Sequence, residues 1–385
     1  CQLEGSYIVS TPSSGYHRTK AELERRHNLK EKVWGGKISL QPFKSGEFGI
    51  TFQHHKLPFS KYPNHDLENI FRSSAPVNYV TGLYTHLTFT KTSLFGEIAR
   101  SKSGGIAAYC GLCRSGSIYE TVFSLRHYSP NYYNEFANAF AEFSHIDNEK
   151  GMYLGILLNT SAKTKLSTFI DAYQELWPHI SNCLPRKGTE FSLQWDWEMR
   201  KQLSLQLRYK RNQRHEAFNV NDQFDNETKR LFPYLKHQTI VQMDIQRSRL
   251  HLRTRLQIHW DKLRGNFCRS VPVTDSVSTL IYQDLKIKMT PGISLNTRWT
   301  AFDVPTFPLR IYQFENGLPG CMSIQMLNGR GTRWYLLCRL KFKHVRFSCK
   351  YGHTRYDNKQ SFGSGNSLVR QSWDHSFEAQ FQWQF

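Results

Sequence analysis

Aromatic and polar residues alternate strictly along the C-terminal stretch SFEAQFQWQF, residues 376–385. The aromatic positions, all of one parity, are Phe377, Phe381, Trp383 and Phe385. Side chains of a strand point alternately to its two faces, so a strand here would gather all four aromatic side chains on one face. A helix with the same pattern would scatter them around its axis. The pattern therefore predicts a terminal β-strand with one aromatic and one polar face.

The same period of two recurs along the chain, in segments 76–91, 189–198, 202–210, 239–246, 250–260, 334–342 and 345–351. In segment 250–260, for example, Leu252 and Leu256 oppose Arg253 and Arg255. Four of these seven segments have about the nine to eleven residues that a tilted strand needs to cross a bilayer. We therefore expect transmembrane strands, with one face toward lipid.

Short and long connections alternate between these segments. Tight polar turns are expected at 198–201 and 247–249, and long polar loops at 211–236, 261–275 and 354–376. This arrangement is typical of an all-β, antiparallel, up-and-down transmembrane β-barrel, and the chain length suits about 14 to 18 strands. We expect an N-terminal segment over 1–33 and a barrel over 34–385, which is either complete or lacks upstream strands.

A soluble β-sandwich or propeller is the competing interpretation of the same alternation. Strands of those folds are usually about five or six residues long, and no blade-length repeat is evident in this chain. Tryptophans near strand ends fit the aromatic girdles of a membrane barrel, although they also fit an ordinary core; they are Trp195, Trp197, Trp260 and Trp334. Mean hydropathy is −0.57, and no apolar run approaches the length of a transmembrane helix.

Two segments have helical features. Residues 19–34 are rich in helix formers, and Thr19 is a candidate N-cap, so we expect a short helix there, on a loop or in the lumen. Residues 164–177 place apolar side chains at helical spacing before Pro178, so this segment alone reads as an amphipathic helix. An unbroken strand meander favours a strand instead, and we expect a strand there.

Eight cysteines are present, and only Cys110 and Cys113 have a spacing used in metal or redox sites. No second pair or matching histidines accompany them, so we expect incidental strand or turn cysteines and no metal site. Cys1 opens the chain; it is either the acylated first residue of a mature lipoprotein or the start of a chain processed at that point.

Several stretches resemble one family: SGYHRTKAELERR (14–26), RHYSPNYYNEFANAFAEFSHIDNEKGMYLGI (126–156), IYQDLKIKM (281–289) and RIYQFEN (310–316). They are similar to the C-terminal outer-membrane barrel of Bacteroidota-type helix-hairpin-helix, ComEA-like proteins. The resemblance implies location in the bacterial outer membrane, a strand over 164–177 and a link to DNA uptake. Family members usually carry a DNA-binding helix-hairpin-helix upstream, and no such paired helices precede residue 34.

Within a barrel, the alternating terminal strand would have a defined role. Phe377, Phe381, Trp383 and Phe385 would face lipid on the strand that closes the sheet. A terminal Phe after alternating aromatics resembles the signal read by the barrel assembly machinery. Outer-membrane lipids and that machinery are therefore expected partners.

The polar faces of the predicted strands are basic, in keeping with a net charge of +20. The candidates for lining the lumen are Arg208, Lys210, Arg253, Arg255, Lys286, Lys288, Arg339 and Lys341. A cation-lined pore concentrates anions and slows cations. The pattern predicts passage of anionic solutes or DNA, unless these charges are paired with acids or lie at the rims.

No sequence motif for catalysis, such as GxSxG, HExxH or a P-loop, is present. Glu135, Glu142 and Glu149 recur every seven residues, and we interpret them as solvated turn and lumen acids. We expect no enzyme activity and no cofactor. Two functions stay open: a transport-linked pore with a basic lumen, and a structural or interaction barrel plugged by its own loops.

Overall fold

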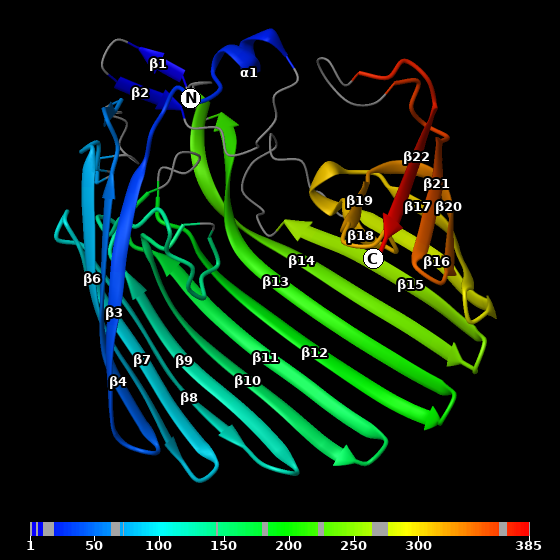
Figure 1. Cartoon of the computed structure of the whole chain (residues 1–385), viewed down its shortest axis with the longest axis horizontal. Coiled ribbons are helices and arrows are strands. Elements are labelled where there is room, and N and C mark those ends of the chain that lie inside the picture. Colours follow the sequence, from blue (N-terminus) through cyan, green and yellow to red (C-terminus); the bar gives the residue numbers. More distant parts are fainter. Residues whose placement is uncertain are drawn as a thin grey trace. The chain divides into compact units, whose positions relative to one another are not determined.

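The computed structural model describes residues 2–4, 7–10, 19–62, 70–71, 73–143, 145–178, 184–221, 227–263, 276–361 and 368–384. Their regular structure is almost entirely β-strand (Figure 1). Among the described residues, helical structure is confined to the short helix α1 (Lys20–Glu24) and the 3-10 turn η2 (Phe307–Leu309). None of the helices in these ranges has the length and apolar character needed to cross a membrane.

Seventeen strands follow one another in the main sheet, within the 14 to 18 expected from the sequence. They are β3 (Lys32–Phe43), β4 (Gly46–Lys56), β6 (Val77–Phe89), β7 (Thr92–Ser101), β8 (Ile106–Ser115), β9 (Tyr119–Tyr128), β10 (Glu149–Ser161), β11 (Thr164–Glu175), β12 (Lys187–Arg200), β13 (Leu203–Asn221), β14 (Glu227–Gln246), β15 (Leu250–Leu263), β16 (Val277–Thr290), β17 (Ile293–Val304), β20 (Gly329–Phe342), β21 (Val345–Tyr356) and β22 (Trp373–Trp383).

Two small sheets accompany the main one. The first joins β1 (Gln2–Glu4), β2 (Tyr7–Ser10) and β5 (Ser60–Lys61), and the second is the hairpin of β18 (Ile311–Glu315) and β19 (Ser323–Leu327). The first main-sheet strand, β3, begins at Lys32, close to the expected start of the barrel at residue 34.

Short turns and longer connections alternate along the main sheet, as the sequence predicts for an up-and-down barrel. Thr90 and Lys91 join β6 to β7, and Lys343 and His344 join β20 to β21, whereas residues 129–148 and 305–328 are long connections. Thr90 and Lys343 have φ values of 49° and 45°, the left-handed conformation that tight hairpin turns require.

The chain divides into two compact units. Unit 1 comprises Cys1–Leu157, Phe169–Glu190 and Arg214–Phe232; unit 2 comprises Leu158–Thr168, Phe191–Gln213 and Pro233–Phe385. Within unit 1, β3, β4, β6, β7, β8 and β9 pair antiparallel in sequence order. Within unit 2, the antiparallel pairs run from β14 through β15, β16, β17, β20 and β21 to β22.

Burial is inverted relative to a water-soluble protein. On β16 and β17 the outward side chains of Ile281 and Trp299 are 45% and 51% exposed, whereas the charged Asp284 and Arg298 are only 8% and 4% exposed. Exposed apolar side chains over many neighbouring strands exceed what a soluble monomer tolerates, and they suit contact with hydrocarbon. The alternation read from the sequence therefore produces a lipid-facing apolar face and a buried polar inner face.

Two long connections pack on the inner faces of the strands. Residues 129–148, the inner loop, pack Ala137, Ala141 and Ile146 against a cluster of Val80, Ala99, Ala107, Tyr128 and Tyr132 in unit 1. Residues 305–328, the inner hairpin with η2, β18 and β19, place Ile311 and Leu327 against Leu280, Tyr282, Phe302 and Val304 in unit 2. Each unit thus carries its own inner segment.

The structure confirms some local predictions and corrects others. Segment 164–177 is a strand, β11, as its barrel context indicates. A short helix, α1, begins in the segment 19–34 as expected, and Thr19 caps it with its side chain in a capping box. The helix ends at Glu24, and its apolar Leu23 is 50% exposed. Residues 211–221 and 227–236 are not a loop: they extend β13 and β14, since backbone pairing tolerates polar side chains.

The C-terminal strand lies where the alternation predicts it. β22 pairs with β21, and its outward residues Phe377, Phe381 and Trp383 are all more than 60% exposed. Phe385 lies outside the described residues, as do Cys1 and the FGSGNS stretch at 362–367.

Candidate functional site

A row of alternating charges crosses the inner face of unit 2. In register, Asp244 of β14 faces Arg253 of β15, Arg253 faces Asp284 of β16, and Asp284 faces Arg298 of β17. The row ends on Tyr335 of β20. Cross-strand pairs of opposite charge stabilise a sheet, and their order here follows from the period-two pattern of four separate strands.

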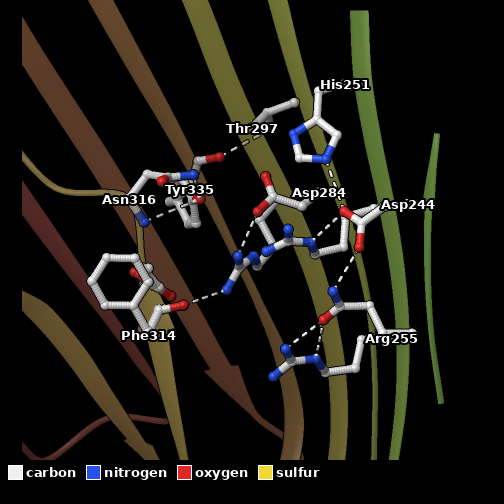
Figure 2. A network of polar contacts seen from close by, with 12 residues as sticks. Asp244, His251, Arg255, Asp284, Thr297, Phe314, Asn316 and Tyr335 are labelled. Atoms are coloured by element: carbon white, nitrogen blue, oxygen red, sulfur yellow. Dashed lines mark hydrogen bonds and ion pairs between the residues drawn. The ribbon is translucent and has the colours of Figure 1, made fainter. Parts of the chain in front are cut away.

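Hydrogen bonds link the row to its neighbours (Figure 2). Asp244 accepts from Arg253 Nε at 2.7 Å and pairs with His251 Nε2 at 2.8 Å. Gln242 donates to Asp244 at 2.6 Å, and its carbonyl oxygen accepts from Arg255 Nε at 2.9 Å. Gln242 therefore connects the acidic end of the network to Arg255, whose guanidinium donates to this neutral amide.

The cations of this network outnumber its carboxylates. Arg255 experiences the positive charges of Arg208, Arg253 and Arg298, and its guanidinium stacks over Tyr282 at 5.5 Å. We call Arg208, Arg253, Arg255 and Arg298 the arginine group; Asp244 pairs with Arg253, and Asp284 pairs with Arg298. An excess of fixed positive charge on a partly buried polar face attracts small anions.

The inner hairpin is attached to the same wall by polar contacts. Arg298 Nη1 donates to the Phe314 carbonyl at 2.7 Å, and Arg339 donates to the Gly317 carbonyl at 2.7 Å. Asn316 Nδ2 donates to the Tyr335 hydroxyl at 3.2 Å. Arg298 thus belongs both to the charge row and to the attachment of the hairpin.

Glu315 is the most deeply buried anchor of the hairpin, with no exposed surface. Arg333 Nε and Nη2 donate to its carboxylate at 2.6 and 3.0 Å, and Lys350 Nζ donates at 2.9 Å. Burial alone would raise the pKa of Glu315, but the hydrogen bonds and charges of Arg333 and Lys350 bring it below its usual value. The carboxylate therefore stays ionised between two wall cations.

Unit 1 has an ion cluster of the opposite composition. Arg126 of β9 pairs with Glu149 of β10 and, through Nη1 and Nη2 at 2.8 and 3.1 Å, with Asp171 of β11. Glu149 also accepts the backbone N–H groups of Glu142 and Phe143 in the inner loop, at 3.0 and 3.3 Å. The inner loop is therefore held by its backbone on a carboxylate of the wall.

This cluster corrects one prediction. Glu149 is 0% exposed and is not a solvated acid, because an inward position at the start of β10 places it between Arg126 and the loop backbone. Glu135 of the inner loop is exposed and pairs with Lys61 at 2.9 Å. The seven-residue spacing of the glutamates does not indicate which of them is buried and which is exposed.

The eight predicted basic residues lie on the strands and polar parities expected. Arg208, Lys210, Arg253, Arg255, Lys286 and Arg339 are half-buried, and Lys288 and Lys341 are exposed beside turns. The structure brings Arg208, Arg253 and Arg255 into one group and directs Arg339 to the inner hairpin. The network also contains Asp284 of β16 and Arg298 of β17. Their positions on the polar faces of these strands could have identified them from the sequence.

Cys110 and Cys113 do not form a paired site. Both lie on β8, and their odd spacing puts them on opposite faces of that strand. Across the described ranges, no group of three or more His, Cys, Asp or Glu side chains is arranged to hold a metal ion.

Comparison with known proteins supports the fold. No family model and no curated protein matches the chain. Among solved structures, the copper transporter OprC superposes with a TM-score of 0.51 at 9% identity, covering 91% of this chain and 65% of OprC. The chain thus spans about two thirds of the length of OprC.

Other solved structures match with lower similarity. The siderophore receptor PirA from Acinetobacter baumannii has a TM-score of 0.44 at 8% identity, with 91% of this chain and 64% of PirA covered. OccK8 (OprE) of Pseudomonas aeruginosa has a TM-score of 0.36 at 10% identity, with 92% of each chain covered. The superposition on OprC and the inverted burial together confirm the predicted outer-membrane β-barrel fold, and the predicted outer-membrane localisation agrees with it.

Proposed function

We propose that this outer-membrane β-barrel protein is a non-enzymatic, transport-linked pore that favours small anionic solutes. The observation that carries the proposal is the arginine group of unit 2. Its member Arg255 is hydrogen-bonded to a neutral amide while three further arginines act on it. Such a wall raises the local concentration of anions and disfavours cations.

Planar bilayers provide the test. Purified protein under a salt gradient should give a conductance whose reversal potential indicates anion selectivity. Arg255→Gln combined with Arg208→Gln should shift that potential toward the cation side, because two positive charges of the arginine group are removed. Lys201→Gln is the matched control, since Lys201 is exposed in the turn between β12 and β13. Cation-selective conductance in the wild type, or equal shifts in both variants, would overturn the proposal.

A structural or interaction barrel plugged by its own segments is the second candidate. The observation that favours it is the complete burial of Glu315, which fixes the inner hairpin to β20 and β21. On this account wild-type protein is silent in bilayers, and Glu315→Gln, which frees the hairpin, produces conductance. Steady wild-type conductance excludes this candidate.

Passage of DNA is the narrower form of the first proposal that the family resemblance implies. In the same bilayers, single-stranded DNA should cause transient current blockades that weaken steeply as salt is raised, because phosphate contacts with arginines release counterions. DNA that leaves the current unchanged at low salt would remove DNA from the proposed cargo.

The C-terminal strand supports a second expectation about partners. Phe377, Phe381 and Trp383 form an exposed aromatic row on β22, the kind of surface that we propose outer-membrane lipids cover and the barrel assembly machinery reads. Replacing Phe381 by Asn should lower the yield of assembled, heat-modifiable protein in outer-membrane fractions. Replacement of the inward Gln380 by Asn is the control.

A further inference from the structure

Two cysteines face each other directly across the β20–β21 pair. Cys338 lies opposite Cys349 in the register, and both belong to the outward parity of their strands. The two thiols lie within interaction range of each other. Both side chains are half-buried, and both thiols are free in the structure.

The backbone already satisfies the geometry of a disulfide. Directly opposed residues of an antiparallel pair have Cα atoms about 4.5 to 5.5 Å apart. Disulfides span Cα separations of about 4.4 to 6.8 Å, so no strand needs to move for Cys338 and Cys349 to be joined. Cys110 and Cys113 provide the contrast, because they share β8 but lie on opposite faces.

The surroundings leave room for the bond. In the same row, Cys338 faces Leu295 of β17 and Cys349 faces the small Ala379 of β22. The row lies on the lipid-facing side, where the thiols would be shielded from aqueous reagents after insertion. Oxidation is therefore easiest before the strands enter the bilayer.

We propose that Cys338 and Cys349 are a modification site, oxidised to a cross-strand disulfide when the β20–β21 hairpin has paired outside the cytoplasm but has not yet entered the bilayer. This rests on the proposed outer-membrane location, since disulfides form in the oxidising compartment that such a chain crosses. The oxidant is a disulfide, either of an oxidoreductase or of a small thiol compound.

The exchange is balanced in two steps. The Cys338 thiolate attacks one sulfur of the oxidant disulfide, forming a mixed disulfide and releasing one thiolate. The Cys349 thiolate then attacks the Cys338 sulfur, forming the Cys338–Cys349 bond and releasing the second thiolate. The two cysteines lose two protons and two electrons, and the oxidant disulfide is reduced to two thiols.

The bond would fix the register of one hairpin before assembly. β21 pairs with β20 on one edge and with the terminal strand β22 on the other. A slip of one residue would turn every apolar side chain of a strand inward. A disulfide between directly opposed residues admits only the observed register, so β22 would join an edge that is already correctly aligned.

Refolding of the purified full chain tests the geometry without reference to its location in the cell. Denatured, reduced protein is refolded into detergent with oxidised glutathione, alkylated and digested for mass spectrometry. We expect the peptides that contain Cys338 and Cys349 to be joined, and reduction to release them. Cys110→Ser, the control, should leave this linkage unchanged, whereas Cys338→Ser should abolish it. Recovery of both cysteines in alkylated form would overturn the proposal.

A second measurement tests the cellular step. Cells that express the protein are alkylated at lysis, and the same peptides are examined without reduction. Joined peptides support oxidation in the cell. Free thiols in the cell, together with a disulfide after refolding in vitro, would overturn the proposed cellular oxidation. Fractionation of the membranes tests the outer-membrane location separately.

Discussion

The ion clusters of the two units have opposite arrangements of charge. In unit 1 one cation, Arg126, lies between the carboxylates of Glu149 and Asp171. In unit 2 one carboxylate, Glu315, lies between the cations of Arg333 and Lys350. Both central side chains are almost completely buried, and each cluster lies beneath a segment that packs on the inner face.

The difference shows which part of the chain supplies the charge. All three charged groups of unit 1 come from wall strands. The inner loop contributes backbone N–H groups to Glu149 and the ring of Phe140, over which the Arg126 guanidinium lies at 5.0 Å. In unit 2 the central charge belongs to the inner hairpin itself. The hairpin is therefore held by a charged side chain of its own, which can be titrated or substituted, whereas Glu149 of the wall holds the inner loop through backbone N–H groups.

Removal of the central charge should give the largest effect. Breaking a buried ion pair from one side costs about 3–5 kcal/mol, because the remaining charges stay buried without a partner. We expect Arg126→Gln and Glu315→Gln each to lower the free energy of unfolding by about that amount, measured in urea with vesicle-inserted protein. Only Glu315→Gln should make the inner hairpin sensitive to protease.

Glu120→Gln is the control for both variants, because Glu120 is exposed at the start of β9. Equal protease sensitivity of residues 305–328 in Arg126→Gln and Glu315→Gln would contradict the proposed difference between the units.

Lowering the pH should reproduce part of the stability loss that is expected for Glu315→Gln. The pKa of Glu315 lies below its usual value, since Arg333 and Lys350 outweigh the opposite effect of burial. A carboxyl group with a lowered pKa in the folded state stabilises the fold above its unfolded pKa, about 4.3, and loses this contribution as pH falls through the folded value. The difference in unfolding free energy between wild type and Glu315→Gln should therefore shrink below about pH 4. A constant difference would contradict it.

Removal of a peripheral charge should cost less. Asp171→Asn leaves the pair of Arg126 and Glu149, and Lys350→Gln leaves Glu315 with the two hydrogen bonds of Arg333. The expected loss is about 1–3 kcal/mol in each case, the contribution of a hydrogen bond to a charged group. Urea unfolding of each variant checks this, and a loss as large as that of the central substitutions would show that the clusters act as indivisible units.

The smallest effects are expected at two tyrosines. The Tyr128 hydroxyl donates to the Phe140 carbonyl of the inner loop at 2.8 Å, and the Tyr335 hydroxyl accepts from Asn316 of the inner hairpin at 3.2 Å. Tyr128→Phe and Tyr335→Phe should each cost about 1 kcal/mol. Hydrogen exchange should rise only in the segment that each tyrosine contacts; a rise in both segments would argue against separate attachment.

Much of the wall could be predicted from the sequence because a strand encodes its faces locally. Leu252 and Arg253 need only their neighbours to reveal which face each belongs to. The same rule identified β22, whereas the strand over 164–177 was expected from the meander around it, because its own spacing indicated a helix.

The inner segments could not be predicted in the same way. Glu149 and Glu315 become buried because Arg126 and Arg333 face them from other strands, and those partners follow from register and long-range packing. The extension of β13 and β14 through polar residues could not be predicted from the sequence either. Backbone pairing does not depend on an apolar side chain, so polarity alone suggested a loop.

The central claim is that the apolar parity of the strands contacts hydrocarbon while the polar parity is buried. It is tested most directly by photolabelling the vesicle-inserted protein with a carbene precursor on a lipid tail. Trp334 and Leu336 of β20 are outward, whereas Tyr335 and Leu337 are completely buried. The account predicts label on Trp334 and Leu336 and none on Tyr335 and Leu337. Label on Tyr335 and Leu337, or protection of Trp334 and Leu336, would contradict it.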